Sequence, residues 1–333
     1  MQIEKERLLD LIENFSGKRI AVWGDIIYDE YIFGTTRRIS REAPVLILSY
    51  RSKEYYLGGA GNSIYNLKAL GAETVPVGII GKDNAGDEII QLLDKLSIQA
   101  DHILIENDFQ TPIKTRILAG EETTKKQQIL RIDKEAQVPD KTPLIRQLKD
   151  FLLSLLPSVD ALLISDYNYD NVKQEVFKAV LEEYKKAGIP VTLDSRFRTS
   201  HFKDITIATP NEPELEGAMQ IELSGNESIF ENAGTGLMEK IRAQAVLITR
   251  GAKGMVLFEK EKSPFAIPAH GTPDIVDVTG AGDTVISVLT LALACGSNFR
   301  DAAKLANFAA SIVVMKKGTA AVSIPELKKT IAS

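Results

Sequence analysis

Residues 277–284 read Asp-Val-Thr-Gly-Ala-Gly-Asp-Thr and lead into an apolar run, 284–294, that Gly296 would end. The pattern predicts a helix that begins inside this stretch. Its glycines allow a tight turn and the close approach of a ligand, and the backbone N–H groups at a helix start can bind phosphate oxygens. The stretch therefore predicts an anion hole formed by Gly280, Ala281 and Gly282.

Asp283 falls in the first turn of this predicted helix. A carboxylate there can accept the proton of a hydroxyl group that receives a phosphoryl group. An acidic residue in a first turn also complements the helix dipole, which by itself explains most such residues. Asp283 is therefore a candidate catalytic base, and its surroundings must decide between the two explanations.

Around this stretch, short apolar runs alternate with amphipathic segments, as in a parallel sheet covered by helices on both faces. The helix predicted over 172–186 shows the pattern, with Val172, Val176, Val180 and Leu181 along one stripe. We expect one α/β domain over residues 1–333. Its predicted strands and helices occupy 19–24, 61–70, 74–80, 87–96, 161–165, 172–186, 191–194 and 245–249.

Two regions interrupt this alternation, at about 26–57 and 111–133. Both carry short runs of β-branched and aromatic residues separated by charged or glycine-containing turns. We expect them to form a small antiparallel second sheet. Because the first region leaves a strand and returns to a helix of the main pattern, a lid is the natural interpretation, with two ordinary surface hairpins as the alternative.

The composition is that of an ordinary folded protein. The 333 residues are 44% hydrophobic and 26% charged, with a formal net charge of -5, which argues against nucleic acid or an anionic membrane as partner. A single cysteine, Cys295, excludes an intramolecular disulfide and fits a reducing compartment. Residues 1–7 lack the apolar segment of a signal peptide, and the run 285–295 is too short to span a bilayer. We expect a cytoplasmic protein.

Two other phosphate-binding motifs do not fit. A Walker A loop requires G-x-x-x-x-G-K-[ST], but Lys18 is followed by Arg19 and Lys82 by Asp83. A dinucleotide fingerprint starting at the glycine turn would need a third small residue where the chain has Val285, and it would lie early in the chain.

Candidate ligand-binding residues also follow the first predicted strand. That strand ends in Gly24-Asp25, and Asp29 comes four residues later, at the edge where α/β sheets bind ligands. Asp25 is a candidate clamp for a sugar hydroxyl, although a turn-forming aspartate explains it equally well. Residues 58–62 read Gly-Gly-Ala-Gly-Asn before a predicted helix, so bare backbone and the Asn62 amide can approach a small ligand, with a helix N-cap as the alternative.

Two later segments are ambiguous in the same way. Asn211 and Glu214 have the spacing of a helix capping box, which is sufficient to explain them. The glycine turn 250–254 between the runs 245–249 and 255–259 fits a plain hairpin. Basic residues in both lid segments suggest a phosphorylated substrate, although solvated charge on an edge strand is equally plausible; they are Arg37, Arg38, Arg41, Lys114 and Arg116.

Taken together and in order, five motifs resemble those of the ribokinase-like, or phosphofructokinase B, sugar kinases across nearly the whole chain: 24–25, 58–62, 211–214, 249–251 and 277–284. The resemblance implies a three-layer α/β/α sandwich with a β lid, Mg²⁺-ATP as phosphoryl donor and Asp283 as the base. It implies an ATP site at Asn211, Glu212, Pro213, Glu214, Thr249, Arg250, Gly251, Gly254 and Asn307, with Glu214 holding Mg²⁺ through water. As substrate-binding residues we predict Asp25, Asp29, Arg38, Gly58, Gly59, Asn62, Lys114, Arg116, Asp166 and Asp283.

A narrower resemblance is to the heptose 7-phosphate kinases of lipopolysaccharide-core synthesis, carried by 24–31, 38–45, 130–133, 165–167 and 317–319. Those kinases phosphorylate the anomeric 1-hydroxyl of D-glycero-D-manno-heptose 7-phosphate. They are often fused to a nucleotidyltransferase domain, and because the 333 residues here are too few to hold one as well, we expect the stand-alone form.

The chain departs from the heptose kinases at three places: Gly61 where alanine is usual, 168–170 where a Lys-Gly pair is usual, and Ser195-Arg196 where Pro-Lys is more common. These departures leave the sugar open. A kinase for fructose phosphate, ribose or a nucleoside is one alternative, and a non-catalytic sugar-phosphate-binding regulator is another.

Members of the family frequently hold a monovalent cation beside the anion hole. Asp277 and Thr279 match that pattern, and backbone oxygens of Val313, Lys316 and Gly318 would complete it by analogy. The resemblance thus suggests K⁺ as a further cofactor. It also suggests a homodimer formed through paired lids.

Overall fold

The computed structural model describes residues 2–120, 126–271 and 276–332, so residues 121–125 of the predicted lid lie outside it. The strands of its larger sheet are β1 (Arg19–Gly24), β4 (Glu73–Gly81), β5 (Ile103–Glu106), β8 (Ala161–Asp166), β9 (Val191–Ser195), β10 (Ile207–Ala208), β11 (Ala245–Thr249), β12 (Met255–Glu259) and β13 (Phe265–Ile267).

Within the described residues this sheet has nine strands in the order β13-β12-β11-β10-β9-β8-β1-β4-β5. The strands from β11 to β5 pair in parallel, and β12 and β13 are antiparallel at one edge. The mostly parallel sheet predicted from the alternating pattern is confirmed, as is the hairpin between β11 and β12.

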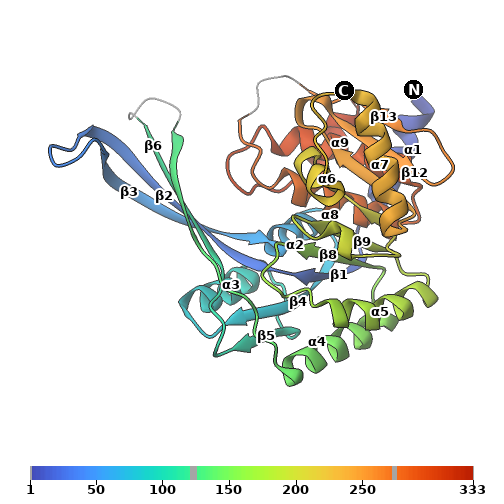
Figure 1. Cartoon of the computed structure of the whole chain (residues 1–333), viewed down its shortest axis with the longest axis horizontal. Helices are drawn as coiled ribbons and strands as arrows, with labels where there is room; N and C mark the ends of the chain where they lie inside the picture. The colour runs from blue at the N-terminus through green and yellow to red at the C-terminus, as the bar shows by residue number, and fades with distance from the viewer. Residues whose placement is uncertain (1, 121–125, 272–275, 333) are drawn as a thin grey trace.

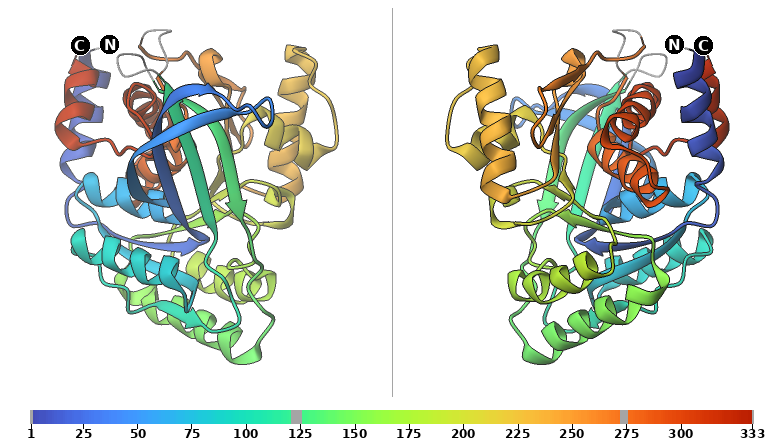
Figure 2. Two further views of the ribbon diagram at one scale, coloured as in Figure 1. Left: turned by 90° about the vertical axis from the view of Figure 1, so that its left-hand side faces the viewer. Right: turned by 90° about the vertical axis from the view of Figure 1, so that its right-hand side faces the viewer.

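Helices cover both faces of the sheet (Figure 1). One face carries α1 (Gln2–Glu13), α2 (Ala60–Ala69), α3 (Asn84–Lys95), α8 (Ala281–Ala294), α9 (Phe299–Val313) and α10 (Ile324–Ala332). The other carries α4 (Thr142–Leu155), α5 (Gln174–Lys186), α6 (Glu212–Met219) and α7 (Glu227–Ile241). The two chain ends lie side by side, where α1 packs against α10 (Figure 2).

Strand β1 shows why the sheet forms between two helical layers. Ile20 and Val22 belong to the core under α8, while Ala21 and Trp23 belong to the core under α5. Alternate side chains of a strand point to opposite faces, so a continuous apolar run is buried on both. Helix α8 is apolar all round for the same reason: it packs against α2, α9 and the sheet, and every residue from Asp283 to Leu293 is buried.

The second sheet consists of β2 (Ile26–Ile39), β3 (Leu46–Gly59), β6 (Ile113–Gly120) and β7 (Gln127–Lys134), in the order β3-β2-β6-β7. Figure 1 shows β2, β3 and β6 extending away from the sandwich, and the left view of Figure 2 looks onto them. We call this sheet the lid. It joins both predicted segments into one sheet rather than two separate surface hairpins.

The prediction of an antiparallel lid was only partly right. The pairs β2–β3 and β6–β7 are antiparallel, but the central pair β2–β6 is parallel. Strand β2 continues directly from β1, and β6 follows β5 along the chain. Because β1 and β5 end at the same edge of a parallel sheet, the two lid segments leave that edge in the same direction.

Candidate active site

The start of α8 lies at the edge of the sheet where its parallel strands end. Gly280 is the N-cap residue with φ 78°, and no side chain caps the helix. A Cβ atom at this position would lie 2.5 Å from Nδ2 of Asn62, so both the backbone angle and the close contact require glycine. The first-turn amides of Gly282 and Asp283 lack intrahelical acceptors and can bind an anion.

Asp283 is buried at the helix start, with 4% of its surface exposed. Asn62 Nδ2 donates to Oδ2 at 2.8 Å, and the Tyr167 hydroxyl donates to Oδ1 at 3.0 Å. Burial raises the pKa of the Asp283 carboxyl to about 6, and the two hydrogen bonds partly oppose that shift. A carboxyl with this pKa can accept a proton near neutral pH, which a residue serving only the helix dipole would not need.

Two cavities meet at Gly282. The first, of about 380 Å³, is mainly apolar and contains the predicted nucleotide residues Thr249, Gly251, Gly254 and Asn307 together with Ala281. The second, of about 480 Å³, is more polar and holds Asp283. We call them the apolar cavity and the charged cavity. Predicted residues lining the charged cavity are Asp29, Gly59, Lys114, Arg116, Asp166, Asn211, Glu214, Thr249, Thr279, Gly280, Gly282 and Asp283.

The lid supplies most of the cations of the charged cavity, and Arg196 comes from the segment after β9. Arg116 Nη1 lies 2.8 Å from Oδ1 of Asp29, and Lys114 Nζ lies 4.7 Å above the ring of Tyr167. Burial lowers the pKa of Lys114. Burial also raises the pKa of Asp29, and the positive charge of Arg116 opposes that rise. A Cβ atom on Gly58 would lie 2.6 Å from the Asp29 carboxyl carbon, so this glycine makes room for the ion pair.

Asp25 and Asp166 use their carboxylates within the protein. Asp25 is fully buried, lies outside both cavity linings, and accepts hydrogen bonds from the amides of Tyr167, Tyr169 and Asn171. Asp166 touches the charged cavity but accepts from Arg198 and from Ser195 Oγ. Both predicted substrate ligands therefore hold the loop after β8. Gly59, with φ 57°, sits against the backbone of Asp25.

Arg38 is a predicted substrate residue that lies outside both cavity linings. It is exposed near the outer end of β2, where it pairs with Ile47 of β3. The described residues of this chain thus bring Lys114 and Arg116, but not Arg38, to the charged cavity. The sequence offered no means of telling the inner from the outer part of a lid strand.

The predicted capping box at α6 is confirmed. Glu214 N donates to Oδ1 of Asn211 at 2.8 Å, and Asn211 N donates to Oε2 of Glu214 at 2.9 Å. Asn211 also forms a β-bridge with Thr249, which joins the start of α6 to the end of β11. Both residues still line the charged cavity, so capping does not remove them from the site.

Three predicted nucleotide residues lie outside both cavity linings. Arg250 forms ion pairs with Glu212 at 2.7 Å and with Glu227 at 2.5 Å, and its guanidinium lies 3.8 Å from the ring centre of Phe230. Glu212 is thereby engaged away from the cavity, and Pro213 occupies the first turn of α6. These residues fix the β11–α6 junction behind the cavities.

Carboxyl groups gather on the wall of the charged cavity opposite the lid. Burial raises the pKa of Glu214 to about 6 and that of Asp194 well above its usual range, and the nearby charge of Asp283 adds to both shifts. No three His, Cys, Asp or Glu side chains among the described residues are close enough to hold a metal by themselves. Glu214 and Asp194, which we call the carboxyl wall, can therefore accept a cation only with additional ligands from water or substrate.

The residues of the suggested monovalent-cation site come together from two loops. The Asp277 carboxylate accepts hydrogen bonds from Thr279 N at 2.9 Å and from Gly318 N at 3.0 Å. The carbonyl of Val314 accepts from the amide of Asp277, while Val313 O accepts from Lys316 N. Asp277 thus ties the loop before α8 to the turn after α9.

Sequence reasoning missed several residues of the charged cavity. Tyr167 and Asp194 lie at the ends of β8 and β9, and the strand-end rule that selected Asp25 would also have selected them. Arg196, directly after β9, would have been selected by the same rule, whereas Gln128, Arg131 and Thr319 carried no such signal.

A glycine turn at a helix start, a buried carboxylate beside it and two adjoining cavities are the parts of a phosphotransferase site. A family model described as the pfkB family of carbohydrate kinases matches residues 18–327. The chain belongs to this family and is an ATP-dependent sugar kinase, which implies ATP and a divalent metal as cofactors. None of the described helices is long and apolar enough to cross a membrane.

Among curated proteins, the chain is similar to the bifunctional protein HldE of Desulfatibacillum aliphaticivorans, with 38% identity over 315 residues, covering 94% of this chain and 63% of that protein. The HldE protein of Pelobacter propionicus is 36% identical over 312 residues, covering 93% of this chain and 62% of that protein. The chain thus spans less than two thirds of the length of these relatives.

Solved structures show the same fold. Arabidopsis thaliana ribokinase complexed with ribose and ATP has a TM-score of 0.66 and 23% identity, and Escherichia coli phosphofructokinase-2 with substrates and products has 0.75 and 19%. Each alignment covers 95% of this chain and 98% of the other. The ribokinase-like sandwich implied by the sequence motifs is confirmed.

Proposed function

We propose that this sugar kinase transfers the γ-phosphate of ATP to the anomeric 1-hydroxyl of D-glycero-β-D-manno-heptose 7-phosphate, a cytoplasmic step toward ADP-heptose and the lipopolysaccharide core. The observation that carries the proposal is the position of the Asp283 carboxylate, buried where the two cavities meet. The similarity to HldE proteins over nearly the whole chain supports the choice of sugar.

In this proposal ATP occupies the apolar cavity and the sugar phosphate occupies the charged cavity. Asp283 accepts the proton of the attacking hydroxyl, while the glycine turn at Gly280 and the free first-turn amides of Gly282 and Asp283 stabilise the charge that develops on the transferred phosphoryl group. The raised pKa of Asp283, about 6, suits a base that is ionised near neutral pH yet still accepts a proton.

A phosphorylated acceptor is supported by the positive charge in the charged cavity. Lys114, Arg116 and Arg131 of the lid line it together with Arg196, which follows β9, so cations gather there in a chain of net charge -5. The Thr319 hydroxyl, on the same cavity, is buried without a hydrogen-bond partner among the described residues. A phosphate group would supply acceptors for these donors.

The carboxyl wall fits Mg²⁺ as the divalent metal. Mg²⁺ in kinases keeps several waters and takes one or two carboxylates together with substrate phosphates. Glu214, and beside it Asp194, would hold the hydrated ion, which would neutralise phosphate charge and relieve the repulsion that adds to burial in raising both pKa values. For K⁺ we propose the loops joined by Asp277; turnover unchanged when Na⁺ replaces K⁺ would exclude it.

We also propose a homodimer formed through the lids. Large apolar side chains are exposed on this sheet, where a second copy would cover them: Ile39, Val45, Leu46, Tyr50, Ile129, Leu130 and Ile132. Sedimentation of Tyr50→Ser/Ile132→Ser should show a lower association constant than the unaltered chain. A monomeric unaltered chain at micromolar concentration would reject this arrangement.

A coupled assay for ADP release tests the central proposal. Heptose 7-phosphate is compared with fructose 6-phosphate, ribose and a nucleoside at equal concentration, and we expect the highest kcat/KM for the heptose. ADP release with another sugar would leave a kinase of different specificity. Thermal stabilisation by a sugar phosphate without ADP release would instead indicate a non-catalytic binding protein.

A further inference from the structure

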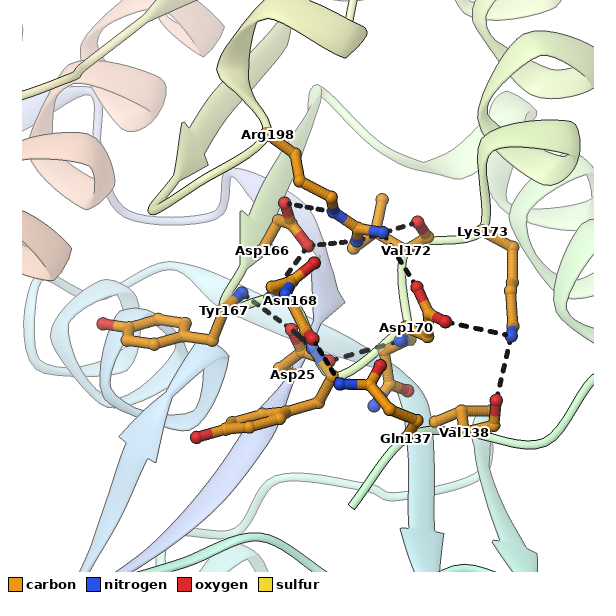
Figure 3. Close-up of polar contacts among 12 residues, drawn as sticks. Asp25, Gln137, Val138, Asp166, Tyr167, Asn168, Asp170, Val172, Lys173 and Arg198 are labelled. Atoms are coloured by element: carbon orange, nitrogen blue, oxygen red, sulfur yellow. Dashed lines mark hydrogen bonds and ion pairs between the residues drawn. The ribbon is translucent and has the colours of Figure 1, made fainter. Parts of the chain in front are cut away.

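The loop between β8 and α5 is held by an unusual number of polar contacts (Figure 3). Asp25, beneath it, accepts hydrogen bonds from the amides of Tyr167 at 2.7 Å, Tyr169 at 3.2 Å and Asn171 at 3.2 Å. The backbone amides of every second residue from 167 to 171 therefore converge on one carboxylate. Because Asp25 is fully buried, this arrangement fixes the backbone of the loop from the inside of the protein.

Ion pairs hold the outer side of the same loop. Arg198 bridges Asp166 and Asp170, with a distance of 2.8 Å to Asp170, and Lys173 bonds Asp140 at 2.6 Å and the carbonyl of Val138 at 2.9 Å. Figure 3 shows Arg198 beside Asp166 and Asp170, and Lys173 beside Val138.

Two residues of the loop adopt a left-handed backbone although neither is glycine. Asn168 has φ 67° and Asp170 has φ 65°. Such conformations cost free energy and persist only where surrounding contacts impose them. The bonds to Asp25 and Arg198 are contacts of that kind, so the loop has one imposed shape.

That shape places Tyr167 between the two aspartates. Its amide is bound by Asp25, and its hydroxyl donates to Oδ1 of Asp283 at 3.0 Å. On the lid side, Lys114 Nζ lies 4.7 Å from the centre of the Tyr167 ring. With Asn62 on Oδ2, each oxygen of the Asp283 carboxylate has one donor, and the plane of the carboxylate is determined.

We propose that Tyr167 is a positioning residue that fixes the Asp283 carboxylate for proton transfer, itself held in place by Asp25. The inference rests on the proposed function because it takes Asp283 as the base. The hydroxyl of Tyr167 acts through Asp283 and favours its ionised form, since a hydrogen bond donated to a carboxylate stabilises the charge.

The pH dependence of turnover reports this role. The Asp283 carboxyl, with a pKa of about 6, must lose its proton before it can accept one, so activity falls as pH drops through this value. Without the Tyr167 hydroxyl the charged form loses a donor and the pKa rises further. Other ionisable groups that face this carboxyl come from four elements and stay unchanged: Asp29, Lys114, Asp194 and Glu214.

The experiment compares Tyr167→Phe with Tyr169→Phe in the full chain. Both remove one hydroxyl from the same loop, but Tyr169 donates to Glu135 rather than to Asp283. We expect Tyr167→Phe to move the acidic limb of the kcat profile up by about one pH unit, which lowers kcat about tenfold below pH 6, with KM for ATP unchanged. Tyr169→Phe should leave the acidic limb in place.

An acidic limb unmoved in Tyr167→Phe, or moved equally in Tyr169→Phe, would overturn the inference. Titration of the buried carboxyl by infrared difference spectroscopy measures the same shift without turnover. If that shift appears while no sugar phosphate yields ADP, the positioning contact stands and the proposed function fails. If ADP is released normally and neither readout moves, the function stands and the positioning role fails.

Discussion

The sandwich and the lid are built by different means from the same chain. Strands such as β1 and β8 are apolar and buried on both faces, whereas every residue of β7 is exposed. The sandwich is stabilised by apolar burial, and so is the inner end of the lid, where Ile26, Tyr28 and Leu57 join the core. The outer part of the lid depends on its backbone ladder, and the inner end also carries the ion pair between Asp29 and Arg116. The difference teaches where each proposed task would lie: the packed core would hold the proposed base and phosphate site, and the lid would contribute to substrate recognition.

The largest expected effect breaks the chemistry of the sandwich. Asp283→Asn keeps the shape of the side chain but cannot accept the proton, so kcat should fall by about 10²–10⁴-fold. The thermal midpoint should stay near that of the unaltered chain, because burial of a charge is removed together with the base. Turnover close to normal in a folded variant would show that Asp283 is not the base.

A second pair of variants compares the stability of the two regions. Leu163→Ala empties a fully buried position of β8 and should lower the free energy of unfolding by about 2–5 kcal/mol. Measured at a protein concentration at which the chain is monomeric, Leu130→Ala removes a side chain that is 52% exposed on β7 and should change it by less than about 0.5 kcal/mol. Urea denaturation measures both. Equal losses would contradict the division into a packed core and an exposed lid.

How much of the fold and of the candidate site the sequence predicts depends on whether the residues in contact lie close together along the chain. The turn before α8 and the capping box of α6 are contiguous motifs, so both appear in the structure where the sequence placed them. The residues around Asp283 are not contiguous: Asn62 and Tyr167 are separated from it by 221 and 116 positions. Only the fold brings them together, and Tyr167 was not selected as a site residue.

Competition between partners explains what the sequence could not resolve. Arg250 follows the end of β11, where Thr249 lines the apolar cavity, yet two glutamates and an aromatic ring bind its guanidinium instead. The Asp25 carboxylate was expected to bind a sugar hydroxyl, but backbone amides of a loop more than 140 positions away occupy it. The type of residue indicates which bonds it can make, and only packing decides which it makes.

Substitutions within the lid sharpen the comparison. Lys114→Met removes a buried cation of the charged cavity and keeps a long, unbranched side chain. We expect it to raise KM for the sugar phosphate about 10–100-fold while KM for ATP stays constant. Arg38→Met is the matched control, because Arg38 is exposed and outside the cavity linings, and should leave both KM values unchanged. Steady-state kinetics that showed the reverse pattern would place the substrate phosphate at the outer lid.

The smallest expected effect concerns the pH dependence of stability. Burial raises the pKa of Asp25, Glu214 and Asp283 to about 6, so the folded protein binds protons that the unfolded chain has released between about pH 4 and pH 6. These groups therefore stabilise the fold below that window, and the contribution is lost as pH rises through about 6. The free energy of unfolding should decrease over this range.

Asp283→Asn isolates one of these three contributions, because the substituted side chain does not titrate. The decrease in the free energy of unfolding between about pH 4 and pH 6 should therefore be smaller in Asp283→Asn than in the unaltered chain. Asp133→Asn, which replaces an exposed carboxylate of the lid, serves as the control and should show the full decrease in the free energy of unfolding. Urea midpoints at several pH values supply the measurement. Parallel curves for Asp283→Asn and the unaltered chain would mean that Asp283 titrates normally, and that the core does not tune its base by burial.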